Sequence, residues 1–274
     1  MNGVGGDDQS NPVLARGMAG AAIEFVGVEK RYGGRSALAG VSLVVPAGQF
    51  VALVGPSGSG KTTLLKTVNR LITPDAGRVS LDGRDVAEGP APALRRRIGY
   101  VFQEVGLFPH LSVAENIGIT PRLLDWSAER TSARVAELLD LVALPPAFAS
   151  RAPAELSGGQ RQRVGVARAL AAEPGVLLMD EPFGALDPIT RDSLGGDVRA
   201  LHDRLGLTTV MVTHDMAEAV LLADRIVVLR DGVVAADGAP ARLLESVTDP
   251  EVRALIETPR RQARRLAERL GDGA

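Results

Sequence analysis

The segment Gly55-Pro56-Ser57-Gly58-Ser59-Gly60-Lys61-Thr62 decides the fold of this chain. An apolar run over residues 50–54 precedes it and predicts a buried strand, and a helical pattern starts at Lys61. Glycines in such a loop let successive backbone N–H groups face one anion, so strand, loop and helix in this order predict a phosphate-binding loop. The alternative is a Gly-rich turn before an ordinary helix, which the correct flanks make the weaker interpretation.

Two side chains at the end of the loop carry its chemistry. Lys61 supplies a positive charge for the outer phosphates of a nucleotide, and the Thr62 hydroxyl is placed to hold Mg²⁺. The predicted nucleotide-binding residues of this segment are Gly55, Pro56, Ser57, Gly58, Ser59, Gly60, Lys61, Thr62 and Thr63.

A second helix start lies at Leu156-Ser157-Gly158-Gly159-Gln160. Ser157 has the character of an N-cap, and residues 160–172 predict a helix with one apolar face. The free N–H groups at such a start attract anions. Taken alone, the segment is more typical of a plain capped helix than of a ligand site.

The two segments together resemble the ATP-binding cassette (ABC) ATPases. Residues 156–160 match the signature motif of that family, and they lie between a phosphate-binding loop and the acidic strand 176–181, as in the family. The similarity covers about residues 23–237. Further residues that match family motifs, in the family's order, are Tyr32, Gln103, Gly184 to Asp187 and His214.

The alternation of strands and helices and the resemblance both predict an α/β fold of the P-loop ABC-ATPase type. We expect a mainly parallel sheet, an antiparallel β subdomain with a turn at Asp82-Gly83, and an inserted helical subdomain over about residues 104–156. The predicted strands span 23–28, 41–45, 50–54, 78–81, 98–102, 176–180, 208–213 and 225–229. The predicted helices span 61–71, 128–141, 160–172, 191–205 and 216–223.

The chain divides into three predicted parts: a flexible leader at 1–21, an ATPase domain at 22–247 and a basic helical tail at 248–274. In the tail, Asp249-Pro250 and Thr258-Pro259 each predict a helix start. Five arginines follow Pro259. They favour a solvated helix on the domain edge, with contact to anionic lipid or to an acidic loop of a partner as the alternative.

The resemblance implies the hydrolytic roles. Asp180 would hold Mg²⁺ through water, and Glu181 would polarise the attacking water. Gln103 would touch the metal and the water, and His214 would contact the γ-phosphate of ATP. The alternative for the two carboxylates is that they cap the next helix. The implied catalytic residues are Glu181, His214, Gln103 and Lys61, and the implied metal site consists of Thr62, Gln103 and Asp180, with ATP and Mg²⁺ as cofactors.

A phosphate-binding loop leaves the outer face of the γ-phosphate bare, and a second helix start could cover it. The family implies that this cover comes from a second subunit, through Ser157, Gly158, Gly159 and Gln160, with Asp187 crossing the interface. Tyr32 would stack on adenine.

The composition of the chain limits the classes of protein to which it can belong. The chain has 274 residues, 45% hydrophobic and 23% charged, which is typical of a globular protein. A net charge of -2 does not indicate binding to nucleic acid, which favours basic proteins. The absence of cysteine excludes disulfides. No apolar run approaches the roughly 20 residues that span a bilayer, and the N-terminus does not have the pattern of a secretory signal. In a membrane process, another chain would do the spanning.

The segments 104–110 and 120–126 look like those of importers of glycine betaine, choline and other quaternary amines. We therefore expect an ATPase subunit that works as a homodimer on transmembrane permease subunits, with a solute-binding protein as an indirect partner. Its place would be the cytoplasmic face of the inner membrane. The alternatives are an ATPase of another importer (polyamine, sulfonate or amino acid) and a soluble ABC ATPase that is not coupled to transport. Apolar Val105, Leu107, Phe108 and Leu111 either receive a permease helix or form the subdomain's own core.

Overall fold

The computed structural model describes residues 20–245, 247 and 249–271. Most of the predicted leader, residues 1–19, therefore lies outside the described part, as do residues 248 and 272–274 of the predicted tail. Within the described residues, no helix is both long and apolar enough to cross a bilayer.

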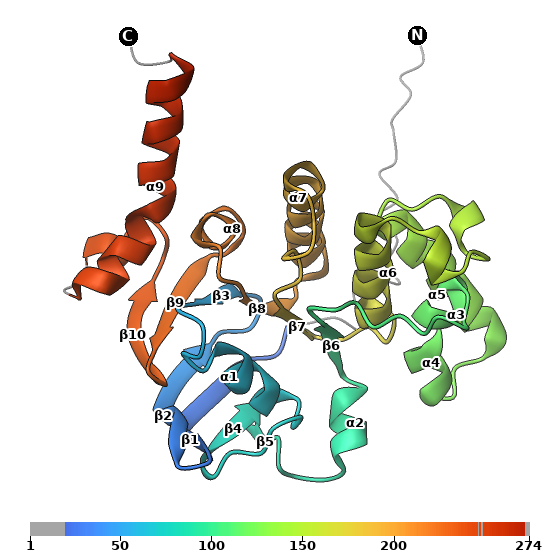
Figure 1. Ribbon diagram of the computed structural model, residues 1–274. Coiled ribbons are helices and arrows are strands. Elements are labelled where there is room, and N and C mark those ends of the chain that lie inside the picture. Colours follow the sequence, from blue (N-terminus) through green and yellow to red (C-terminus); the bar gives the residue numbers. More distant parts are fainter. Residues whose placement is uncertain (1–19, 246, 248, 272–274) are drawn as a thin grey trace, which may run out of the picture.

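Two sheets form the frame of the molecule (Figure 1). The larger has the order β10-β9-β3-β8-β7-β6, in which every neighbouring pair is parallel except β9 and β10. Its strands are β3 (Phe50–Val54), β6 (Ile98–Val101), β7 (Val176–Asp180), β8 (Thr208–Val212), β9 (Arg225–Arg230) and β10 (Val233–Gly238). The smaller sheet is antiparallel, in the order β2-β1-β4-β5, with β1 (Ile23–Tyr32), β2 (Arg35–Val45), β4 (Ala76–Leu81) and β5 (Arg84–Asp85). The predicted α/β fold with an antiparallel β subdomain is confirmed.

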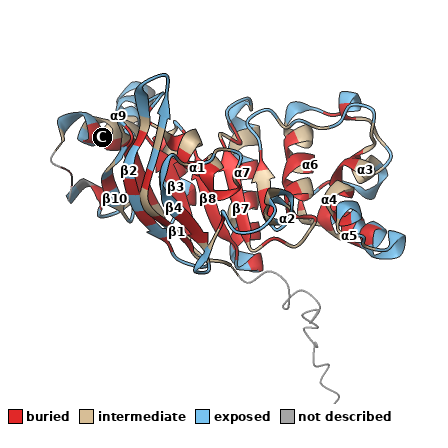
Figure 2. Ribbon diagram, turned by 90° about the horizontal axis from the view of Figure 1, so that it is seen from below, coloured by how far each residue is buried: buried red, intermediate tan, exposed pale blue. Residues whose placement is uncertain are grey.

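Helices cover both faces of the larger sheet, because its central strands carry apolar side chains on both sides. On one face, Phe50, Ala52 and Val54 of β3 pack in a cluster with α6 (Gly158–Leu170), α7 (Pro188–Leu205) and α8 (Met216–Leu222). On the other face, Val51 and Leu53 pack with α1 (Lys61–Val68) and the smaller sheet. The buried residues accordingly concentrate along the strands in Figure 2.

The segment between β6 and α6 contains helices and loops and, among the described residues, no strand, as predicted. Its elements are α3 (Val113–Ile117), α4 (Ile119–Leu123), α5 (Ala128–Leu141) and the 3₁₀ turns η2 (Pro146–Phe148) and η3 (Pro153–Glu155). Leu138 and Leu139 of α5 and Ile117 of α3 pack with α6 in the same core cluster as the sheet face. This subdomain therefore shares a core with the helix that begins at Ser157.

The apolar residues after Gln103 divide between the two predicted roles. Leu107 packs partly buried against the core, whereas Phe108 stays about half exposed, at 46%. Phe108 alone of these two offers surface to a partner.

Some elements differ from the predictions. The strands β1 and β2 are longer than expected, and β10 and the short helix α2 (Ala91–Arg95) were not predicted. The second helix start in the tail is wrong, because α9 runs unbroken over Pro250–Leu270 with Pro259 inside it. Proline removes one backbone donor, and the side chains of Thr258 and Arg261 both donate to the Ala254 carbonyl in the turn before it, at 2.8 and 2.9 Å. The N–H that the proline lacks would have paired with the Leu255 carbonyl, so these side-chain bonds lie one residue before the missing bond.

The start of α9 is packed and its end is exposed. Val252 and Ile256 are buried in the core, and Arg230 pairs with Asp249, which caps the helix. From residue 260 onward the described side chains are nearly all exposed, and Figure 1 shows this part extending away from the body. The division into leader, ATPase domain and tail stays a prediction.

Candidate active site

The loop after β3 has the backbone conformation that its glycines predict. Gly60, the N-cap of α1, has φ 101°, and a Cβ there would lie 2.3 Å from the Ala37 carbonyl oxygen. Gly55 has φ 143°, and a Cβ there would lie 2.1 Å from the Leu229 carbonyl oxygen. Only glycine fits either position, because an L side chain would be strained and would also clash with backbone.

Lys61 folds back over this loop. Its Nζ donates to the carbonyl oxygens of Gly55 and Pro56, at 2.8 and 2.9 Å, and the residue is buried. Burial lowers the pKa of Lys61, against the opposing charges of Glu181 and Asp180. The Ser59 hydroxyl is also buried, with no hydrogen-bond partner in the part of the chain that the structure describes. A buried ammonium and an unpartnered hydroxyl beside a glycine loop suit an anionic phosphate.

Asp180 ends β7 and faces α1. Its Oδ1 accepts a hydrogen bond from the Thr62 hydroxyl at 2.8 Å. Its Oδ2 accepts one from the Tyr100 hydroxyl at 3.2 Å and lies 3.3 Å from Lys66 Nζ. The Thr62 hydroxyl and the Asp180 carboxylate are hard oxygen donors of the kind that hold Mg²⁺ together with phosphates. The amide oxygen of Gln103, whose Nε2 donates to the adjacent Glu181, is a third donor of this kind. The residues therefore fit the predicted metal.

Glu181 contacts two other predicted hydrolytic residues, Gln103 and His214. Its Oε2 accepts a hydrogen bond from Gln103 Nε2 at 3.2 Å and lies 3.3 Å from His214 Nδ1. Glu181 has φ 47°, in the left-handed region, and its N–H donates to the Val212 carbonyl. This conformation is uncommon for glutamate, and such strain often marks functional positions.

The sheet explains why these residues meet. Gln103, Glu181 and His214 follow β6, β7 and β8, which are neighbours in one parallel sheet. The carboxyl ends of parallel strands lie at one edge, where ligands of open α/β sheets bind. The structure thus brings together the loop, Asp180, Glu181, Gln103 and His214.

The second predicted helix start, at Ser157, lies on a surface separate from the phosphate-binding loop. Ser157 caps α6 in a capping box, because its hydroxyl accepts from Gln160 N–H while Gln160 Oε1 accepts from Ser157 N–H. A Cβ on Gly159 would lie 2.4 Å from Thr190 Cγ2, and the Thr190 N–H donates to Asp187, the N-cap of α7. Hydrogen bonds from Thr190 lower the pKa of Asp187. Ser157, Gly159 and Asp187 therefore border one surface.

That surface is not joined to the chain's own phosphate-binding loop. Among the described residues, no hydrogen bond or ion pair links residues 157–160 to residues 55–63. Figures 1 and 2 both show α6 and α1 well apart, with strands of the larger sheet between them. A phosphate held by one loop would not reach the other within a single copy.

Tyr32 ends β1 with its ring about half exposed, and Lys30 Nζ lies 5.6 Å from the ring centre. An exposed ring leaves a face available for stacking.

Three further side chains, which the sequence did not single out, support the site. Tyr100 and Lys66 contact Asp180, and Arg168 donates to the backbone of the loop that follows Gln103. The spacing of Thr62 and Lys66, one helical turn, could have indicated Lys66.

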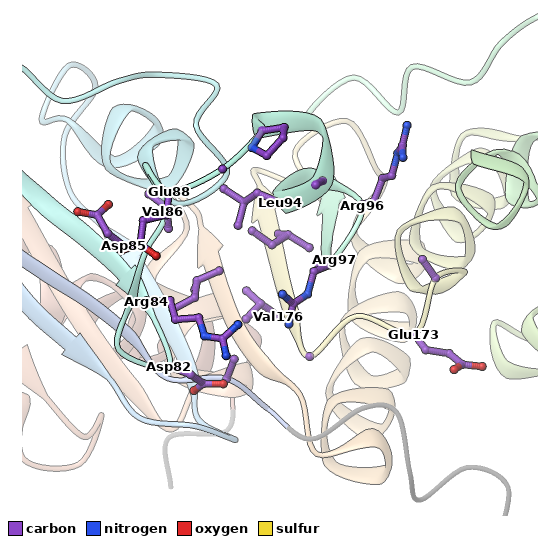
Figure 3. A pocket seen from close by; sticks show the side chains of 18 of the residues that line it. Asp82, Arg84, Asp85, Val86, Glu88, Leu94, Arg96, Arg97, Glu173 and Val176 are labelled. Carbon is purple, nitrogen blue, oxygen red and sulfur yellow. The ribbon is translucent and has the colours of Figure 1, made fainter. Parts of the chain in front are cut away.

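A cavity of about 900 Å³ opens at the opposite end of the sheet, at the starts of β6 and β7 (Figure 3). Arg84 and Arg97 extend toward the region of Val176, whereas Arg96 points away. None of the predicted site residues lines it. The predicted chemistry therefore lies at the other edge of the sheet.

Comparison with known proteins finds a matching family and similar proteins. A model of the ABC transporter family matches residues 38–184. The choline transport ATP-binding protein OpuBA of Bacillus subtilis (strain 168) is 50% identical over 230 residues, which are 84% of this chain and 60% of that protein. The glycine betaine uptake system ATP-binding protein YehX of Escherichia coli (strain K12) is 48% identical over 231 residues, which are 84% of this chain and 75% of that protein.

A solved structure is similar as well. The dimeric post-hydrolysis state of the ATP-binding cassette MJ0796, bound to ADP and Pi, aligns with a TM-score of 0.71 and 35% identity. The alignment covers 79% of this chain and 98% of that chain.

Proposed function

Because the chain belongs to the ABC transporter family, we propose that it is an ATP-hydrolysing subunit that powers import through membrane-spanning permease subunits. The observation that carries this proposal is the meeting of Gln103 and His214 on one oxygen of Glu181, next to Asp180 and the Lys61 loop. A non-enzymatic binding module would have no need for this complete set.

Each side chain has a task in hydrolysis. The loop N–H groups and Lys61 bind the outer phosphates, and Lys61 exchanges its two carbonyl partners for them. Glu181 accepts a hydrogen bond from the attacking water, orients it for in-line attack and takes its proton, while Gln103 and His214 hold the carboxylate in place. Thr62, Asp180 and Gln103 would hold Mg²⁺, which neutralises charge on the phosphates when it is bound.

The complete site requires two copies. Ser157, Gly158, Gly159 and Gln160 of one copy close over the nucleotide in the other, and Asp187 contributes from the same surface. Their separation from the chain's own loop supports this arrangement.

The transported solute is an osmoprotectant, such as glycine betaine or choline. Two relatives at about half identity carry those solutes in their names, and the segments 104–110 and 120–126 point the same way. The chain works at the cytoplasmic face of the membrane, bound to the permease, and a solute-binding protein delivers the solute. The chain spans 60% of the length of the choline relative, so these partners rest on similarity over the ATPase region.

Hydrolysis is tested by phosphate release from the purified protein with Mg²⁺ and ATP. We expect Glu181→Gln to bind ATP normally and to lose turnover by at least about 100-fold, as loss of a general base typically costs 10²–10⁴. Glu173→Gln is the matched control, because Glu173 precedes β7 at its far end and pairs weakly with Arg130. Normal turnover in Glu181→Gln would remove Glu181 from its role.

The solute is tested by uptake in cells that produce the intact transporter. When Glu181→Gln replaces the wild type, we expect uptake of radiolabelled choline or glycine betaine to fall to background, while Glu173→Gln keeps it. If uptake of a polyamine, sulfonate or amino acid falls instead and quaternary amine uptake stays normal, the osmoprotectant assignment is wrong.

A further inference from the structure

The Asp180 carboxylate is held on both of its oxygens. The side chain is 8% exposed, and a carboxylate removed from water needs donors on each oxygen. Thr62, which the proposed site assigns to the metal, occupies Oδ1 at 2.8 Å. The Tyr100 hydroxyl and Lys66 Nζ occupy Oδ2, at 3.2 and 3.3 Å. The two oxygens therefore face different partners.

Strand register brings Tyr100 to this carboxylate. Tyr100 of β6 pairs with Leu178 of β7, and Asp180 follows Leu178 by two residues on the same face. Leu178 packs in the cluster beneath α1, and Tyr100 packs against that cluster. The tyrosine ring thus packs against the apolar cluster, and its hydroxyl reaches the Asp180 carboxylate.

The Tyr100 hydroxyl acts here as the donor. A carboxylate oxygen can only accept a hydrogen bond, so the phenol O–H, 3.2 Å away, faces Asp180 Oδ2. Lys66 lies one turn after Thr62 on α1, so the same helix carries a partner for each oxygen.

We propose that the Tyr100 hydroxyl is a positioning residue for the metal site: it fixes Asp180 Oδ2, so that Oδ1 stays turned toward Thr62 and toward Mg²⁺. The inference rests on the proposed function. Without the phenol, Oδ2 would keep only the ion pair with Lys66, whose side chain is long and flexible, and metal binding would have to order the carboxylate further. Outer partners of metal ligands act in this way in other proteins, where their loss lowers metal affinity about 10- to 100-fold.

The test is Tyr100→Phe, which keeps the ring and removes only the hydroxyl. Mn²⁺ serves as the probe because it prefers the same oxygen ligands and its free form is measured by electron paramagnetic resonance. With a non-hydrolysable ATP analogue, we expect Mn²⁺ to bind the variant about 10-fold more weakly than the wild type. We expect the affinity for the analogue in EDTA to stay within about twofold, because residues 55–61 are untouched. At saturating Mg²⁺, turnover of Tyr100→Phe should return to the wild-type rate. The variant should differ only in needing a higher Mg²⁺ concentration to reach that rate.

Thr67→Val is the matched control. Thr67 is a buried hydroxyl on the same helix, but it donates to the Leu64 carbonyl and not to Asp180. We expect this variant to lower thermal stability in EDTA without changing Mn²⁺ affinity. Equal Mn²⁺ affinity in Tyr100→Phe and the wild type would overturn the inference, and so would an equal loss in Thr67→Val. If the wild type itself bound no metal–nucleotide complex, the proposed function would fail as well, so the two failures are distinguishable.

Discussion

Arg168 joins the helix that begins at Ser157 to the loop that follows Gln103. Its Nη1 donates to the Gly106 carbonyl at 2.7 Å, and its Nη2 donates to the Val105 carbonyl at 2.6 Å. Burial lowers the pKa of Arg168, and in the described part of the chain no carboxylate forms an ion pair with it. Because both Nη groups of the guanidinium donate to carbonyls of this loop, Arg168 restrains the loop in one conformation.

We therefore expect Arg168→Met to loosen the loop. Hydrogen exchange of the amides in residues 103–107 should become about 10-fold faster, since a hydrogen bond to a charged group contributes roughly 1.5 kcal/mol. Mass spectrometry of peptides from this region measures the exchange.

Arg163→Met is the control for this experiment. Arg163 lies on the same helix but bonds the Val142 carbonyl and Asp197. Arg163→Met should leave the amides of residues 103–107 as protected from hydrogen exchange as they are in the wild type. Unchanged exchange in Arg168→Met would mean that Arg168 does not restrain the loop.

The helices and strands that position the site could largely be predicted from the sequence. The helix at 128–141 and the strand at 176–180 match the structure at both ends, because each has a clear apolar pattern and a sharp boundary. Lys61 and its loop could be predicted from a local pattern, whereas the resemblance to the ABC ATPases supplied the roles of Gln103, Glu181 and His214. These three residues follow neighbouring parallel strands.

Other elements could not be predicted in this way. β10 has a mixed pattern, since its exposed edge position leaves only Ala236 buried. Pro259 is a normal stop signal, and the sequence pattern around it does not show that α9 continues through it to Leu270. The Tyr100 contact with Asp180 depends on strand pairing between residues 80 positions apart, which no local pattern records.

In the whole molecule, the two parts of the proposed active site lie apart from each other. One half is the phosphate-binding loop with Asp180, Glu181, Gln103 and His214. The other is the surface bordered by Ser157, Gly159 and Asp187, which lies across the strands from that loop (Figure 1). Two copies related by a twofold axis would pair each loop with the opposite surface, and both sites would then be complete. ATP would hold the copies together, and hydrolysis would release them to move the permease.

The most direct test of this account is the molar mass of Glu181→Gln measured by light scattering during size-exclusion chromatography. With ATP and Mg²⁺, the account predicts twice the 28.7 kDa mass of one chain, and a return to that mass when ATP is removed. Adding Ser157→Arg to the same protein should leave ATP binding intact and abolish the dimer, because a bulky charge would stand at the shared face. A single-chain mass for Glu181→Gln with ATP bound would contradict the account.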